Sequence, residues 1–142
     1  MTFTYDPAMA AAESDSTRWD AGIARYREVY GDDFIAFERG TVPFFDLMIE
    51  QLFAEVWSRP HLSIPERRLL LIGAIAAPGH YDILQIQLTR ALAAGELTPD
   101  QVREAVIQLT PYVGYPSSGG LLQASEAAIT AVTKELDPRD GQ

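Results

Sequence analysis

Apolar residues recur every three or four positions through most of the chain, the spacing that places them on one face of an α-helix. Ser63-Ile-Pro-Glu66 and Thr98-Pro-Asp-Gln101 each set a hydroxyl residue three positions before Glu or Gln, which is the pattern of an N-terminal capping box. Pro78-Gly79 and Gly95 are typical helix ends. The pattern predicts helices over 63–77, over 80–94 and from 98 to about 110.

The other apolar segments also have helical spacing, and alternating strand patterns are absent. We expect helices over 17–30 and 42–57, a short one over 32–39, and a last one that begins near Pro116. The fold class predicted is therefore all-α, a compact bundle of about six to seven helices. We expect a single helical domain over 17–136, a flexible N-terminus over 1–16 and a flexible tail over 137–142.

The composition of the chain excludes several classes of binding partner and of chemistry. A chain of 142 residues with 47% hydrophobic residues can bury a core of its own. A net charge of −9 argues against nucleic acid or an anionic membrane as the main partner. With no cysteine, the chain cannot use a thiolate, a disulfide or a Cys-ligated metal.

A secretory signal has a basic start followed by an apolar run. The first 16 residues contain no Lys or Arg and no such apolar run. The longest strongly apolar run, 69–77, is far shorter than the roughly 20 residues of a membrane span. We therefore expect a cytoplasmic protein with no membrane partner.

Two arginines, Arg67 and Arg68, lie near the start of the 63–77 helix, whose apolar stretch predicts burial on every side. A helix N-terminus favours anions, so its dipole does not explain two cations there. A carboxylate should face them, from Glu66, from another helix or from a ligand. Each arginine either forms a structural ion pair or is solvated, or one of the two binds an anion.

Gln87 and His80 lie on the following helix. Gln87 is one turn from Leu84 and Ala91, so its amide either ties the core together or lines a pocket. His80 follows Pro78-Gly79, at a junction between loop and helix where a histidine is usually a solvent-facing or capping residue.

Further polar candidates have ordinary structural readings. Glu104 and Gln108 lie off the apolar stripe of their helix, which indicates a solvent-exposed face. Tyr112 belongs to a glycine-containing turn, where it either lies at the edge of a pocket or closes the edge of the core. No nucleophile elbow, H-E-x-x-H or P-loop occurs, and the two histidines are far apart. We expect no metal and no cofactor.

Several motifs follow one another over about residues 43–130. They are Trp57-Ser58-Arg59-Pro60, Arg67 or Arg68 before an apolar helix, Ala91-Leu92 with Gly95, Glu104 with Gln108, and Tyr112-Val113-Gly114-Tyr115-Pro116. In this order and spacing, the motifs resemble the carboxymuconolactone decarboxylase family. The resemblance implies the alkyl hydroperoxidase D-like all-α fold and assembly into trimers or hexamers.

Some relatives in that superfamily are peroxidases with a Glu-x11-Cys-x2-Cys-x3-His relay. On this chain the spacing falls on Arg68, His80, Ile83 and Gln87, so the relay residues are all replaced. Because that chemistry needs a cysteine thiolate, thiol peroxidase activity is excluded. Gln87 also stands where the decarboxylases of the family have their central His.

The resemblance and the spacing together predict a cofactor-independent lyase or isomerase acting on a small carboxylated lactone, enone or cyclic acid. Arg68 would bind a carboxylate or an oxyanion, His80 would transfer the proton and Gln87 would orient a carbonyl. Arg67, Trp57 and Tyr112 would contact the substrate.

Two alternatives stay open: a biosynthetic cyclase or dehydratase on the same fold, and a non-catalytic ligand-binding relative. Self-association is expected from the resemblance and from an apolar surplus at Phe44, Phe45, Leu47, Met48 and Phe53.

Overall fold

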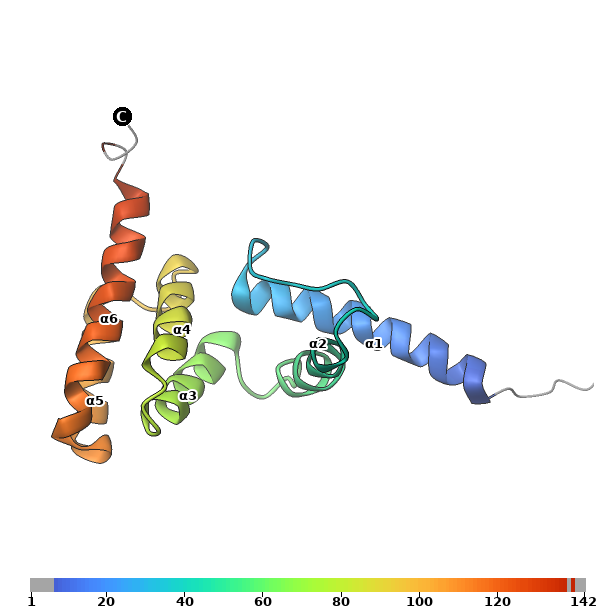
Figure 1. Cartoon of the computed structure of the whole chain (residues 1–142), viewed down its shortest axis with the longest axis horizontal. Helices are drawn as coiled ribbons and strands as arrows, with labels where there is room; N and C mark the ends of the chain where they lie inside the picture. Colours follow the sequence, from blue (N-terminus) through green and yellow to red (C-terminus); the bar gives the residue numbers. More distant parts are fainter. Residues whose placement is uncertain (1–6, 138, 140–142) are drawn as a thin grey trace, which may run out of the picture. The chain divides into compact units, whose positions relative to one another are not determined.

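The computed structural model describes the backbone of residues 7–137 and 139, and side chains from residue 17 onward. The described residues form six α-helices and one π-helix and contain no strand, which confirms the all-α prediction (Figure 1). Contacts divide the chain into two units, which are treated separately: unit 1 is Met1–Leu62 and unit 2 is Ser63–Gln142.

Unit 1 contains α1 (Pro7–Tyr30), α2 (Pro43–Leu47) and the π-helix η1 (Met48–Val56). The helix predicted over 42–57 is present, but most of it has π geometry, in which Trp57 N–H donates to the Leu52 carbonyl five residues earlier at 2.9 Å. Helix α1 begins at Pro7 rather than at residue 17.

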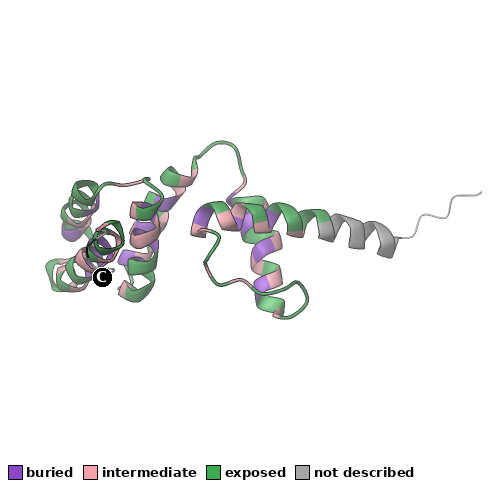
Figure 2. Cartoon of the chain, turned by 90° about the horizontal axis from the view of Figure 1, so that it is seen from above, coloured by how far each residue is buried: buried purple, intermediate pink, exposed green. Residues whose placement is uncertain are grey.

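Helices α1 and η1 approach closely at Gly22. A Cβ atom on Gly22 would lie only 2.2 Å from the Ile49 carbonyl oxygen, so only glycine fits there. The side chains around the crossing are mainly aromatic, and Tyr26 packs edge-on against both Phe45 and Phe53. Figure 2 shows the buried positions of unit 1 gathered where these helices meet. Aromatic packing therefore supplies most of this small core.

The short helix predicted over 32–39 is wrong, because these residues form turns and irregular backbone. Side chains of α1 bind the carbonyl groups that such a helix would need. Arg27 Nη1 donates to the carbonyls of Asp32 and Phe34 at 2.7 and 2.8 Å, and the Tyr26 hydroxyl donates to that of Ile35.

Unit 2 contains α3 (Ile64–Ala76), α4 (Tyr81–Ala93), α5 (Pro99–Val113) and α6 (Tyr115–Leu136). Both predicted capping boxes are present. Glu66 N–H donates to Ser63 Oγ, and Gln101 N–H to Thr98 Oγ1, each at 3.2 Å. The hydrogen bonds that Ser63 makes with the Glu66 carboxylate lower the pKa of Glu66. Local sequence thus sets where α3 and α5 begin.

Helix α4 lies at the centre of unit 2, where it packs against α3 and α6, and α6 also packs against α5 (Figure 1). Helix α3 is not buried on every side, contrary to the prediction, because Leu69 and Leu70 are exposed. The buried apolar core consists of Ile72, Ala76, Leu84, Leu88, Val102, Leu121, Ala124, Ala128 and Ile129.

The predicted flexible ends lie partly outside the described residues, which exclude 1–6, 138 and 140–142. The single domain over 17–136 stays a prediction. None of the described helices is both long and apolar enough to cross a membrane.

Two adjacent glycines of α6 have opposite surroundings. A Cβ atom on Gly120 would lie 2.3 Å from the ring of Tyr81, whose hydroxyl donates to the Ser117 carbonyl at 3.1 Å. A Cβ atom on Gly119 would meet nothing within 4 Å. The contact between α4 and α6 thus requires a residue without a Cβ atom at position 120.

We predict that Gly120→Ala lowers the free energy of unfolding by about 1–3 kcal/mol, because the methyl group must displace the Tyr81 ring. Gly119→Ala, the control, should raise it by about 0.5–1 kcal/mol through helix propensity. Denaturant unfolding of both variants measures this. Equal effects of the two substitutions would contradict the packing described.

Candidate functional site

Arg68 is the largest fully buried side chain of the described residues. It lies in the second turn of α3, and its exposed fraction is 0%. Removing a guanidinium from water is costly unless its charge is compensated and its N–H groups are bonded. Of the two candidate arginines, it is Arg68 that points inward, while Arg67 is only half-buried.

Glu96 compensates the charge of Arg68. Arg68 Nε donates to Glu96 Oε2 at 2.9 Å, and Arg68 Nη2 donates to Glu96 Oε1 at 3.1 Å. The Glu96 side chain is 9% exposed, so water screens this bidentate pair weakly. The carboxylate expected near the two arginines thus comes from the segment between α4 and α5.

Backbone geometry places Glu96 next to Arg68. Gly95 has a φ of +72°, and its N–H donates to the Leu92 carbonyl at 3.1 Å. Glu96 N–H donates to the Ala91 carbonyl at 2.8 Å. Together these bonds form a Schellman motif, which ends α4 and fixes the direction in which the next residue leaves the helix.

Gln87 joins the same network. Arg68 Nη1 donates to Gln87 Oε1 at 2.6 Å, and Gln87 is 3% exposed. Because arginine has only donors, the amide oxygen must face it, and the amide nitrogen therefore points the other way. Three segments far apart in sequence thus meet in one buried polar network: α3, α4 and the turn after α4.

His80 lies apart from this network at the exposed start of α4. It is the N-cap residue, and its side chain makes no capping hydrogen bond. At 1.5 Å of rise per residue, about 10 Å of helix separates its backbone from that of Gln87. The structure therefore brings Arg68 and Gln87 together directly and sets His80 two turns away.

The predicted substrate contacts lie in different environments. Tyr112 is 82% exposed on α5, and Arg67 is half-buried on α3. Trp57 belongs to unit 1, where it is buried and stacks on Phe53 with a ring-centroid distance of 6.1 Å.

Sequence reasoning did not single out Glu96. It is 28 residues from Arg68, so no local spacing connects the two. Two features of the sequence could have pointed to Glu96. It directly follows Gly95, which ends a helix, and the chain has an arginine on an apolar helix that needs a carboxylate partner.

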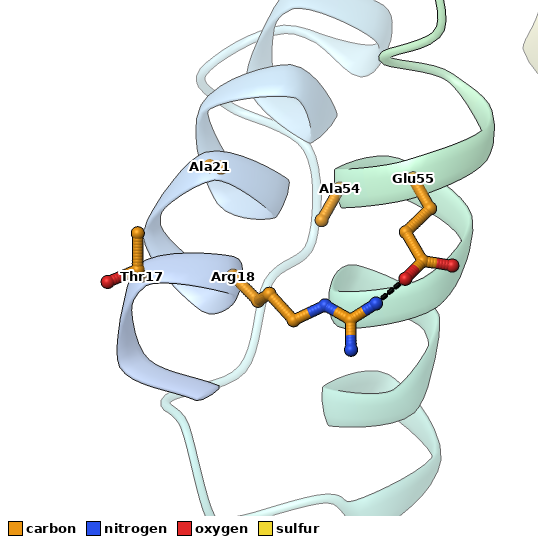
Figure 3. Close-up of a pocket in the computed structure, with 5 residues that line it drawn as sticks. All are labelled: Thr17, Arg18, Ala21, Ala54 and Glu55. Carbon is orange, nitrogen blue, oxygen red and sulfur yellow. Dashed lines mark ion pairs between the residues drawn. The ribbon is translucent and has the colours of Figure 1, made fainter. Parts of the chain in front are cut away.

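An open depression of about 410 Å³ lies between α1 and η1 in unit 1 (Figure 3). It is lined by Thr17, Arg18, Ala21, Ala54 and Glu55, and Arg18 forms an ion pair with Glu55 across it. Both side chains are about half exposed, so water solvates the ion pair and the pair contributes little to the stability of the fold. This depression contains neither a histidine nor any of the predicted site residues.

Among the described residues, no three His, Cys, Asp or Glu side chains come together as a metal site would require. The expected self-association stays a prediction. Of the apolar residues on which it rests, Phe45 and Phe53 are buried within unit 1, whereas Phe44 and Leu47 are exposed.

The chain is similar to two curated decarboxylases. The 4-carboxymuconolactone decarboxylase of Acinetobacter baylyi is 27% identical over 118 residues, which cover 80% of this chain and 87% of the relative. The nitrosuccinic acid decarboxylase of Metarhizium robertsii is 32% identical over 105 residues, which cover 70% of this chain and 72% of the relative. No solved structure matches the chain.

The model of the carboxymuconolactone decarboxylase family matches residues 43–127. That span contains all the predicted site residues and also Glu96. The chain therefore belongs to the carboxymuconolactone decarboxylase family.

Proposed function

We propose that the protein is a cofactor-independent decarboxylase for a small carboxylic acid that carries its own electron-withdrawing group. The observation that carries the proposal is the buried 2.6 Å hydrogen bond from Arg68 to Gln87, in a chain whose relatives are named decarboxylases. It would provide a fixed amide donor at the position that the resemblance assigns to the central His of the family.

The two relatives' substrates, as named, share a chemical feature. Carboxymuconolactone joins a carboxyl group to a lactone, and nitrosuccinic acid joins carboxyl groups to a nitro group. In such acids the bond between the carboxyl carbon and its neighbour breaks, CO₂ leaves, and the electron pair moves onto an oxygen of the withdrawing group. A proton then adds to carbon. Because the substrate accepts the electron pair itself, no cofactor is needed for this step.

Gln87 would stabilise the oxygen on which negative charge gathers. Its amide nitrogen carries two N–H donors, and donors aimed at a developing oxyanion are effective in a site that excludes water. The guanidinium of Arg68 on the amide oxygen polarises the amide and strengthens its N–H groups as donors. An amide cannot give up a proton at neutral pH, so Gln87 would stabilise charge without transferring protons.

Arg68 would act mainly through Gln87. Its charge and that of Glu96 cancel, so the pair would not hold the departing carboxylate tightly, and the loss of CO₂ would not be opposed. Arg67 and Tyr112, which belong to unit 2 like Gln87, remain proposed substrate contacts, and the role of Trp57 stays a prediction.

His80 would deliver the proton. Its exposed side chain can exchange protons with water, and histidine is the most frequent general acid in enzymes. His80 and Gln87 are seven residues apart along α4, so they lie on the same side of the helix axis, and the substrate would lie between them.

One observation favours the non-catalytic alternative: Glu96 already compensates the charge of Arg68, as in a purely structural ion pair. Saturable binding of such acids without release of CO₂ would support that alternative.

We predict that Gln87→Glu lowers kcat about 100- to 1,000-fold in assays of CO₂ release from carboxymuconolactone and nitrosuccinate. The new carboxylate still accepts a hydrogen bond from Arg68 but has no N–H to donate. Gln108→Glu, at an exposed position of α5, makes the same change and should leave kcat intact. Wild-type kcat in the Gln87→Glu variant would contradict the assignment.

We predict that His80→Ala lowers kcat about 100-fold, because proton delivery then depends on water. Since the position is exposed, added imidazole should restore part of the rate. His61→Ala is the matched control, at an exposed histidine of unit 1. An unchanged rate in His80→Ala would remove this residue from the mechanism.

A further inference from the structure

We infer that Glu96 is a positioning residue of this site: it fixes the plane and neutralises the charge of Arg68, and thereby aims the amide of Gln87. This inference rests on the proposed function for its catalytic consequence. The coupling of the three side chains can be tested without a substrate.

The geometry of a guanidinium gives Glu96 this role. The group is planar, and Glu96 binds two of its three nitrogens, Nε and Nη2, with both carboxylate oxygens. Two bonds in one plane leave the guanidinium no freedom to rotate, so they also set the direction of the third nitrogen, Nη1. That nitrogen donates to Gln87 Oε1 at 2.6 Å.

The position of Glu96 is itself fixed. Its backbone is held by the hydrogen bond to the Ala91 carbonyl, one turn after Gln87 on the same helix. Carboxylate and amide therefore move together as parts of α4 and its terminal turn, whereas Arg68 comes from α3. The network thus fixes the register of α3 relative to α4, and with it the position of Arg68 relative to the Gln87 amide.

The neutral charge of the pair also affects which anion the site favours. An uncompensated buried guanidinium would attract the compact carboxylate of the bound substrate most strongly and oppose its departure. With Glu96 present, the electrostatic preference shifts to the amide donor and hence to the oxygen that gains charge during the reaction. Glu96 is therefore expected to raise kcat more than it affects substrate binding.

Unit 2 contains a matched control pair. Arg103 donates through Nε and Nη2 to both carboxylate oxygens of Glu126, at 2.9 and 3.0 Å, in the same bidentate arrangement. Its side chains are 49% and 40% exposed, and it lies outside the buried network. Neutralising Glu126 thus removes the same kind of ion pair without touching the proposed site.

The first test is the ¹H–¹⁵N NMR signal of the Gln87 side-chain amide, assigned by its loss in Gln87→Glu. We expect Glu96→Gln to shift these signals and to speed their exchange with water at least tenfold. Glu126→Gln should change neither. Unaltered Gln87 signals in Glu96→Gln would overturn the inference.

Glu96→Asp covers the case in which Glu96→Gln does not fold. It keeps the charge on a shorter side chain, so we expect Gln87 signals between those of the wild type and those of a network without the carboxylate. Wild-type signals in Glu96→Asp would show that the reach of the carboxylate is irrelevant, which would also overturn the inference.

The second test is kinetic. We expect Glu96→Gln to lower kcat about 10- to 100-fold while KM changes less than threefold, with partial recovery in Glu96→Asp. A purely structural role would reduce the amount of folded protein and leave kcat per folded molecule unchanged. If the wild type releases no CO₂ from any acid, the proposed function fails, and the NMR test still decides whether Glu96 aims Gln87.

Discussion

A buried positive charge is the constraint on which unit 2 depends. Arg68 is completely removed from water, so the fold must supply a negative charge and hydrogen-bond acceptors at fixed positions. Gln87 supplies an acceptor from the middle of α4, and Glu96 supplies the negative charge from the turn after α4. The apolar core alone would allow α3 and α4 to slide past each other by small steps, whereas a bidentate ion pair and a third hydrogen bond permit one register.

The same constraint connects the fold to the proposed chemistry. An amide held at its oxygen by a cation has its nitrogen aimed in one direction, and preorganised donors of this kind are the common means of stabilising an oxyanion. A catalytic histidine at this position would transfer protons itself. With Gln87 there, stabilisation of charge and transfer of protons would be divided between two residues, and His80 is the proposed proton donor.

The sequence predicted what local patterns determine. Both capping boxes, the end of α4 at Gly95 and the helical class of the fold are confirmed, because each depends on residues within a few positions of one another. The short helix over 32–39 was wrong, since side chains of α1 bind its carbonyl groups. The π geometry of η1 and the pairing of Arg68 with Glu96 were not predicted. The pairing depends on the packing of segments 28 residues apart, which no periodicity records.

A double-mutant cycle of Arg68→Met and Glu96→Gln tests whether the buried ion pair holds unit 2 together. The measured quantity is the free energy of unfolding at constant protein concentration. We expect each single variant to lose about 3–5 kcal/mol, because it leaves a buried partner unpaired, and the double variant to lose clearly less than the sum. Strictly additive losses would contradict this coupling. Single losses below about 1 kcal/mol, the value typical of exposed ion pairs, would contradict it as well.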